Sequence, residues 1–217
     1  MDKNIAVIGL GTMGRTICET LVNRGASVLA IDNSIALVDK VKTSVEKAIV
    51  MDTSDSDAIN QAPLDNIDIA IVTIGDSIED NILTTTLLKQ KKIPYIISRA
   101  LNPTHSQVLR QLGADKIINV EEDYGNQLAE ELMNPYVIGK VSINDDYIIQ
   151  EISVEEIPMK VTNKFFANHN IQICAIQRED DLILINDIED IQPNDVLFCL
   201  GSKSNFNTLF QDISRKS

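Results

Sequence analysis

The chain has 217 residues, and its 32 acidic and 19 basic side chains give a formal charge of −13 at pH 7. A hydrophobic fraction of 44% excludes wholesale disorder, and the acidic balance disfavours nucleic acids and anionic lipid surfaces as partners. No apolar run approaches the ~18 residues of a membrane-spanning helix, so direct insertion into a membrane is not expected.

The first 120 residues alternate apolar, β-branched runs with segments of helical spacing. We expect strands at 4–8, 27–31, 47–51, 67–74, 93–98 and 115–120. We expect helices at 14–24, 34–44, 78–91 and 103–112, with another beginning near 54–57. Because successive strands separated by helices need crossover connections, this order predicts an α/β fold with a mainly parallel, doubly wound sheet.

The pattern changes after residue 120. Residues 121–134 predict one amphipathic helix that ends before Pro135. Its narrow apolar stripe, which includes Leu128 and Leu132, serves either the chain's own core or a subunit interface. Beyond it, short strands at 137–143, 147–154, 172–178, 181–186 and 196–201 and a helix at 162–170 predict a small α+β unit. We therefore place the domains at 1–135 and 138–217.

The cysteines and the N-terminal sequence indicate the compartment. Cys18, Cys174 and Cys199 are far apart in apolar stretches, so we expect free thiols rather than a disulfide framework or a zinc site. The N-terminal sequence enters a strand pattern directly and lacks the layout of a signal peptide, so a cytoplasmic protein is expected.

The most informative motif is the segment Gly9–Gly14 (GLGTMG), which follows the first strand and opens the first helix. In that context the three glycines are a dinucleotide-binding fingerprint. Gly9 permits the tight turn, Gly11 lets the backbone approach a pyrophosphate, and Gly14 lets the helix pack close to the sheet. The free N–H groups and the partial positive charge of the helix N-terminus would then face the phosphates.

Asp32 ends the second strand, where its carboxylate can accept both hydroxyls of an adenosine ribose. Its charge would repel a 2′-phosphate, which disfavours NADP. The alternative interpretation is that the glycines serve only a turn and that Asp32 only caps a helix.

Two further loops follow the third and fourth strands and belong to the same crevice of a parallel sheet. Asp52, followed by Thr53, can accept a hydrogen bond from an adenine amino group, or it can cap the helix that begins nearby. Gly75, which follows Thr73, either keeps the crevice floor open or serves a turn.

No catalytic set stands out in the sequence. His105 and His169 are interpreted as surface or cap residues, and there is no CxxC or HxxxH motif. The acidic run at 179–181 is most simply a solvated hairpin turn, with a catalytic or divalent-metal role as the alternative. A nucleotide domain joined to a small domain without catalytic groups favours a sensor over an enzyme.

The sequence resembles the cytosolic regulatory subunits of Trk/Ktr-type (TrkA/KtrA-type) bacterial potassium uptake systems, which are built from RCK domains. The resemblance rests on residues 4–32 and 67–75, and most specifically on 98–105 (SRALNPTH), 112–115 (LGAD) and 117–121 (IINVE). It implies a Rossmann-like N-terminal RCK subdomain that includes the crossover helix. Residues 138–217 resemble the C-terminal RCK subdomain by pattern more than by motif.

The resemblance implies a non-enzymatic regulator that binds an adenine nucleotide, either ATP/ADP or NAD/NADH. Subunits would form a homodimer, commonly assembled into an octameric ring, beneath a membrane-embedded potassium translocating subunit. The protein would be cytoplasmic, at the inner face of the cell membrane through that partner, and ligand exchange would gate ion flow. Some members hold a divalent cation between subunits, and some bind cyclic di-AMP in the C-terminal subdomain.

The motif and the resemblance together give a set of candidate site residues. The glycines line the phosphates, Asp32 holds the ribose, Asp52 and Thr53 lie near the adenine, and Arg99 faces the phosphate crevice. Glu121 matches the acidic position that helps to hold a cation. The full set of expected nucleotide contacts is Gly9, Leu10, Gly11, Thr12, Met13, Gly14, Asp32, Asn33, Asp52, Thr53, Thr73, Gly75 and Arg99.

One position departs from the family pattern. ATP-responsive members often carry an arginine between the second and third glycines, where this chain has Thr12. Arg15 would have to reach a phosphate from a different place on the first helical turn. Because a cation near the γ-phosphate contributes strongly in a partly desolvated site, its loss weakens selectivity for ATP and favours NAD(H), ADP or AMP.

Two other functions remain open at this point. A small NAD-dependent oxidoreductase would need an unrecognised catalytic site, and the short C-terminal half leaves little room for a substrate domain. A nucleotide-sensing transcriptional regulator is disfavoured by the acidic charge and by the lack of a basic recognition helix.

Overall fold

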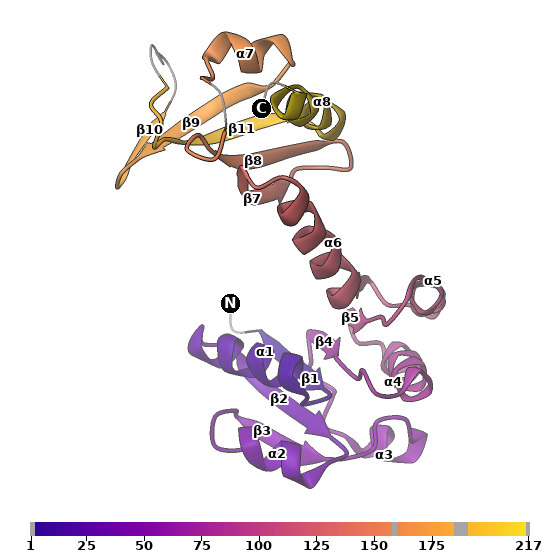
Figure 1. Cartoon of the computed structure of the whole chain (residues 1–217). Coiled ribbons are helices and arrows are strands. Elements are labelled where there is room, and N and C mark those ends of the chain that lie inside the picture. The colour runs from indigo at the N-terminus through magenta and orange to yellow at the C-terminus, as the bar shows by residue number, and fades with distance from the viewer. Residues whose placement is uncertain (1–2, 158–159, 185–190, 216–217) are drawn as a thin grey trace. The chain divides into compact units, whose positions relative to one another are not determined.

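The computed structural model describes residues 3–157, 160–184 and 191–215. Its internal contacts divide the chain into two units, Met1–Tyr124 and Gly125–Ser217, and each is described by itself. Figure 1 labels most of the elements of both units.

The first unit contains a parallel sheet of six strands in the order β3-β2-β1-β4-β5-β6. The strands are β1 (Asn4–Ile8), β2 (Ser27–Asp32), β3 (Lys47–Val50), β4 (Ile69–Val72), β5 (Tyr95–Arg99) and β6 (Lys116–Ile118). The helices are α1 (Thr12–Asn23), α2 (Ile35–Val41), α3 (Ser56–Gln61), α4 (Ile78–Gln90) and α5 (Pro103–Gln111). The predicted doubly wound sheet is thus confirmed. The strand order reverses between β1 and β4, which is where such sheets open a ligand crevice.

Each face of this sheet packs into its own apolar cluster. Ala6 and Ile8 of β1 belong to one cluster, whereas Ile5 and Val7 belong to the other. Alternate residues of a strand point to opposite faces, so a strand covered on both sides is apolar at every position. This explains the continuous apolar runs in the sequence. Cys18 lies in the second cluster, and burial, assisted by the charge of Glu19, raises the pKa of its thiol to about 11.

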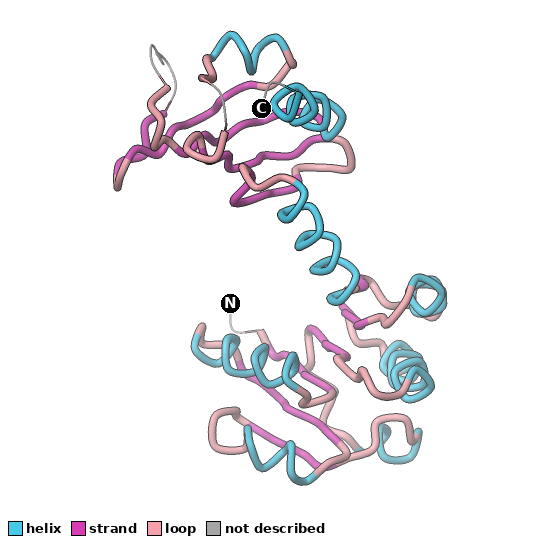
Figure 2. Tube along the Cα trace, viewed as in Figure 1, coloured by secondary structure: helices cyan, strands magenta, loops and turns pink. Residues whose placement is uncertain are grey.

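The second unit contains an antiparallel five-stranded sheet in the order β10-β9-β11-β8-β7, drawn as magenta strands in Figure 2. The strands are β7 (Val137–Ser142), β8 (Tyr147–Ser153), β9 (Gln172–Arg178), β10 (Asp181–Leu184) and β11 (Val196–Ser202). The strand predicted at 196–201 is present as β11. The helix predicted at 162–170 is present as α7 (Asn163–Asn168). Residues 185 and 186, expected to continue β10, lie outside the described residues.

The sequence analysis did not identify α8 (Lys203–Arg215), which completes the second unit. Its buried residues are Phe206, Leu209, Phe210 and Ile213. They recur at the three- and four-residue spacing of a single helical face, so the signal was present. These side chains join the core formed by β8, β9 and β11.

The helix α6 (Val120–Met133) contains the point at which the contacts divide the chain. Its assignment to the first domain therefore stays a prediction. Leu128 and Leu132 are 45% and 76% exposed, so the chain's own core does not bury them. The alternative role, at a subunit interface, stays a prediction. Among the described residues, no helix is long and apolar enough to cross a membrane.

The acidic run at 179–181 forms the turn between β9 and β10, as its simplest interpretation predicted. Arg178 and Asp181 are register partners, which leaves a two-residue loop between the strands. Glu179 has a φ of 55°, which is the left-handed conformation that such tight hairpin turns require. All three acidic residues are exposed.

Candidate functional site

Two of the three motif glycines are required by the chain's own packing. Gly9 has a φ of 92°, and a Cβ there would lie 2.9 Å from the backbone nitrogen of Ile74. A Cβ on Gly14 would lie 1.9 Å from the carbonyl oxygen of Gly9. The Thr73 hydroxyl closes the same turn by donating to the carbonyl oxygen of Gly9 at 2.6 Å. The turn and helix-packing roles expected for Gly9 and Gly14 are therefore present.

Gly11 differs from both because the folded chain does not restrict it. A Cβ on Gly11 would meet no atom within 4 Å. Gly11 is also the N-cap of α1, which has no capping side chain and no acidic residue in its first turn. In the same unit α3, α4 and α5 are capped by the side chains of Asp55, Ser77 and Asn102. The first turn of α1 thus leaves its N–H groups without a side-chain acceptor, which suits an anion.

The Asp32 carboxylate connects the glycine turn to the start of α2. Its Oδ2 accepts from the N–H of Leu10 at 2.6 Å, and its Oδ1 accepts from the N–H of Ser34 at 2.7 Å. Asp32 is only 9% exposed but still lines the open crevice. Each carboxylate oxygen has a second lone pair. Holding the turn and accepting ribose hydroxyls are therefore compatible roles.

The crevice is a pocket of about 350 Å³ at the carboxyl ends of β1 to β5. Nine expected contacts line it: Gly9, Gly11, Asp32, Asn33, Asp52, Thr53, Thr73, Gly75 and Arg99. Seven more residues line it that were not among the expected contacts: Ile8, Ser34, Leu37, Met51, Ile74, Asp76 and Asp80. Ile8, Met51 and Ile74 lie at or just after the ends of β1, β3 and β4, where residues of a parallel sheet are expected to face the crevice. Leu37 has the spacing of an ordinary core residue in α2, so nothing in the sequence marked it.

Four expected contacts lie outside the pocket lining: Leu10, Thr12, Met13 and Gly14. Leu10 is fully buried among apolar side chains, and its N–H is bound by Asp32. Arg15, considered for a phosphate, donates instead from Nη1 to the carbonyl oxygen of Leu10 at 3.0 Å. It is likewise not among the lining residues.

Asp52 and Thr53 both line the pocket but differ in burial. The Asp52 carboxylate accepts from the N–H and the hydroxyl of Ser54 at 2.9 and 2.7 Å. The N-cap of α3 is Asp55, so the alternative that Asp52 caps this helix is wrong. Thr53 is 4% exposed and its hydroxyl bonds that of Thr84 at 2.8 Å.

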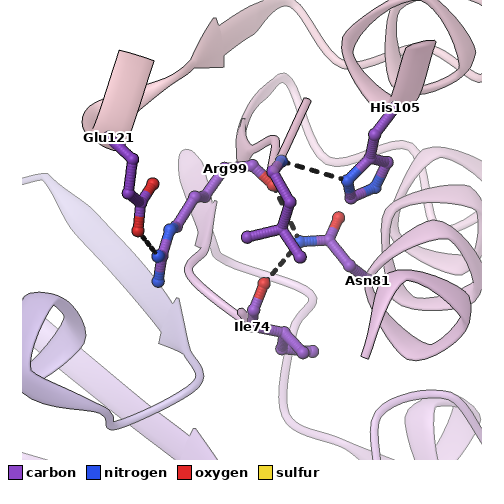
Figure 3. Close-up of polar contacts among 6 residues, drawn as sticks. Ile74, Asn81, Arg99, His105 and Glu121 are labelled. Atoms are coloured by element: carbon purple, nitrogen blue, oxygen red, sulfur yellow. Dashed lines mark hydrogen bonds and ion pairs between the residues drawn. The ribbon is translucent and has the colours of Figure 1, made fainter. Parts of the chain in front are cut away.

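Arg99 is the only basic residue among the described residues that line the pocket. Its guanidinium lies against Gly75, where a Cβ would be 2.5 Å from Nη1, so this glycine makes room for the arginine. Nη2 of Arg99 pairs with the carboxylate of Glu121, as Figure 3 shows. Glu121, the expected cation ligand, is thus engaged by Arg99. The described part of the chain contains no cluster of three or more metal-binding side chains.

The two histidines lie outside the pocket. His105 is not a surface residue, because it is 3% exposed and its Nδ1 accepts from the N–H of Leu101 at 3.3 Å. Burial lowers the pKa of its imidazole. His169 follows α7 as its C-cap and bonds Asp212 of α8 at 3.1 Å.

Comparison with known proteins agrees with this geometry. The TrkA-N domain family matches residues 5–120. Ktr system potassium uptake protein A of Bacillus subtilis (strain 168) is 32% identical over 209 residues, which cover 93% of each chain.

Two solved structures share the fold. The GsuK channel bound to NAD has a TM-score of 0.67 at 16% identity, over 96% of this chain and 39% of that chain. GsuK bound to ADP has a TM-score of 0.52 at 17% identity, over 59% of this chain and 34% of that chain. This chain therefore spans well under half of either structure.

Proposed function

The chain belongs to the TrkA-N domain family, and from this premise we propose that it is a regulatory subunit that binds an adenine nucleotide and controls a membrane potassium channel or transporter. The observation that carries the nucleotide site is the open N-terminus of α1 at Gly11, beside the ribose-accepting position of Asp32. Gly11 follows β1, at the reversal of strand order where doubly wound sheets bind nucleotides, and Asp32 ends the neighbouring strand β2.

The charges of the pocket favour a ligand with few phosphate charges. Four carboxylates line it, those of Asp32, Asp52, Asp76 and Asp80. The one lining guanidinium, on Arg99, is shared with Glu121. Thr12 brings no cation, and Arg15 is turned back onto its own loop. We therefore favour NAD(H), ADP or AMP over ATP, in line with fold neighbours that hold NAD and ADP.

Regulation requires that the ligands discriminate between two states of the protein, because a ligand with equal affinity for both states shifts nothing. We propose that these states are two arrangements of a homodimer or octameric ring, on the cytoplasmic side of the membrane beneath the potassium translocating subunit. A divalent cation at Glu121 and cyclic di-AMP in the second unit are further ligands that this assembly could take.

The test is calorimetry with ATP, ADP, AMP, NAD and NADH, together with light scattering on the same sample. Micromolar binding by a dimer or a larger ring, with no consumption of the ligand, is expected. A monomer that binds none of the five would overturn the proposal. Steady oxidation of NADH would instead indicate an oxidoreductase, which no described residue of the pocket favours.

A further inference from the structure

The helix α4 buries an unusual set of side chains against the sheet. Three of its four buried residues are polar, namely Asn81, Thr84 and Thr85, and all three are fully buried. Burying polar groups lowers stability unless each finds a hydrogen-bond partner, so such groups tend to have a definite role. The partners of these residues show what that role is.

Asn81 connects the chain segments that continue β4 and β5 beyond their last backbone pair. The ladder between β4 and β5 ends at Val72 and Ser98. Beyond it, Nδ2 of Asn81 donates to the carbonyl oxygens of Ile74 and Arg99, at 2.9 and 3.0 Å (Figure 3). One side-chain amide therefore replaces the missing backbone contact between the two chain segments.

The orientation of this amide is determined by its partners. A carbonyl oxygen can only accept, so the nitrogen of the amide must face Ile74 and Arg99. The hydroxyl of Ser98 donates to Oδ1 of Asn81 at 2.8 Å, which keeps the amide in that orientation. Both hydrogens of Nδ2 are used, so a small or apolar side chain would leave two carbonyl oxygens without their partner.

Both strand ends lie at the part of the pocket that contains Arg99, the lining cation that would face a ligand phosphate. Ile74 precedes Gly75, and the guanidinium of Arg99 lies against Gly75. Asn81 itself does not line the pocket. We propose that Asn81 is a positioning residue, which sets the affinity for ligand phosphates by holding the Ile74–Gly75 segment and Arg99 in register. This inference rests on the proposed nucleotide-binding function.

The chain offers a matched control on the same helix face. The Thr85 hydroxyl bonds Ser98 at 3.2 Å and touches no pocket residue by hydrogen bonding. Thr85→Val removes that buried hydrogen bond and should lower the melting temperature without moving Ile74 or Arg99. Asn81→Ala should also lower the melting temperature, so stability alone does not distinguish a structural role from a positioning role.

The distinguishing measurement is the affinity of each variant for adenosine, AMP and ADP. Asn81→Ala leaves the carbonyl oxygens of Ile74 and Arg99 without the amide that holds them. We expect this variant to lose about tenfold in affinity for ADP, while its affinity for adenosine stays at the wild-type value. Thr85→Val should keep both affinities. Ser98→Ala removes the hydroxyl that orients the amide together with its bond to Thr85, a bond that Thr85→Val removes alone. It should give a smaller loss of ADP affinity than Asn81→Ala and remains testable if Asn81→Ala does not fold.

The outcomes separate the two proposals. If the wild-type protein binds neither these three ligands nor ATP, NAD or NADH, the proposed function fails. If the wild type prefers ADP to adenosine and both Asn81→Ala and Ser98→Ala keep that preference, the function stands and the positioning role is overturned. If Thr85→Val lost as much affinity for ADP as Asn81→Ala, the positioning role would also be overturned, because the effect would then come from destabilisation of α4.

Discussion

Three glycines of one short motif have different physical reasons to be glycine. Gly9 and Gly14 are required by backbone contacts within the chain, whereas Gly11 has open space where a Cβ would stand. Any requirement for glycine at Gly11 would therefore come from outside the chain, as it would in the proposed nucleotide site. A ligand phosphate at the N-terminus of α1 supplies such a constraint.

This difference predicts opposite consequences for two substitutions. Gly11→Val should fold with a loss of no more than about 1 kcal/mol, as for a changed N-cap residue, but it should not bind nucleotide. Gly14→Ala should lose about 1–3 kcal/mol or more through overpacking against the carbonyl oxygen of Gly9. Chemical denaturation and calorimetry on both variants measure the two effects. Normal nucleotide binding by Gly11→Val would mean that the fingerprint interpretation is wrong.

At the scale of elements, the pair formed by Arg99 and Glu121 connects β5 to the first turn of α6. A ligand phosphate and the Glu121 carboxylate would compete for one guanidinium. Glu121 is 62% exposed, so the pair contributes little in water, about 0.2–1 kcal/mol. Glu121→Gln should therefore raise the affinity for ADP by about 1.4-fold to fivefold.

A double-mutant cycle separates this competition from a general effect of charge. In an Arg99→Ala background, Glu121→Gln should leave the affinity for ADP unchanged, because the shared guanidinium is gone. Adenosine, which carries no phosphate, should bind all four variants alike. An equal gain with and without Arg99 would show that Glu121 acts only through its long-range field.

In the second unit, Asp195 holds the loop before β11 to the end of β9. It is 1% exposed and accepts from Arg178 through Nε at 2.8 Å and through Nη2 at 3.0 Å. The Arg178 hydrogen bonds hold the pKa of this carboxyl below its ordinary value of 3.8. The stabilisation is therefore complete above pH 3.8 and is lost as the pH falls through the lower pKa of the folded state.

Asp195→Asn should accordingly cost about 2 kcal/mol at neutral pH, a typical value for hydrogen bonds to a charged group. The difference from wild type should shrink in acid, where the wild-type carboxyl becomes protonated. Thermal unfolding from pH 7 to pH 2 checks this, with exposed Asp180→Asn as the control. A difference that stays constant across that range would contradict the assigned role of the ion pair.

The sequence predicted helices and strands well wherever burial gives the apolar residues a regular spacing along the chain. The inner strands β1, β2 and β4 are mostly apolar because both of their faces are covered, and all six parallel strands were expected in order. α4 was expected too, but its polar inner face could not be foreseen, because polar residues on a helix normally indicate its solvent side. α8 carries a regular apolar face that was overlooked.

The site was predictable to the extent that its residues follow strand ends. Gly11, Asp32 and Asp52 line the pocket because Asp32 ends β2, while Gly11 and Asp52 follow the ends of β1 and β3. Leu10 has a similar sequence position but points into the core. The contact between Arg99 and Gly75 joins the end of β5 to the loop after β4, and no local sequence pattern predicts such a contact.

At the scale of the whole molecule, the proposed regulation depends on assembly, and we predict that α6 contributes to the surface between subunits. Tyr124, Leu128 and Leu132 are 63%, 45% and 76% exposed. They recur every four residues and so form one stripe on the helix. A stripe of large apolar side chains in water is unfavourable, and such surfaces typically bind a partner. A second copy of the chain would place two such stripes together.

Leu132→Glu should therefore lower the oligomeric state, because a carboxylate would have to be buried in that contact. Light scattering should report a smaller particle, with circular dichroism and ADP affinity unchanged, since the pocket lies within the first unit. Ile35→Glu is the matched control, because Ile35 is 67% exposed and belongs to α2, outside the stripe. If Leu132→Glu keeps the wild-type mass, assembly uses another surface. If both variants dissociate, exposed apolar residues hold the subunits together without a specific role for α6.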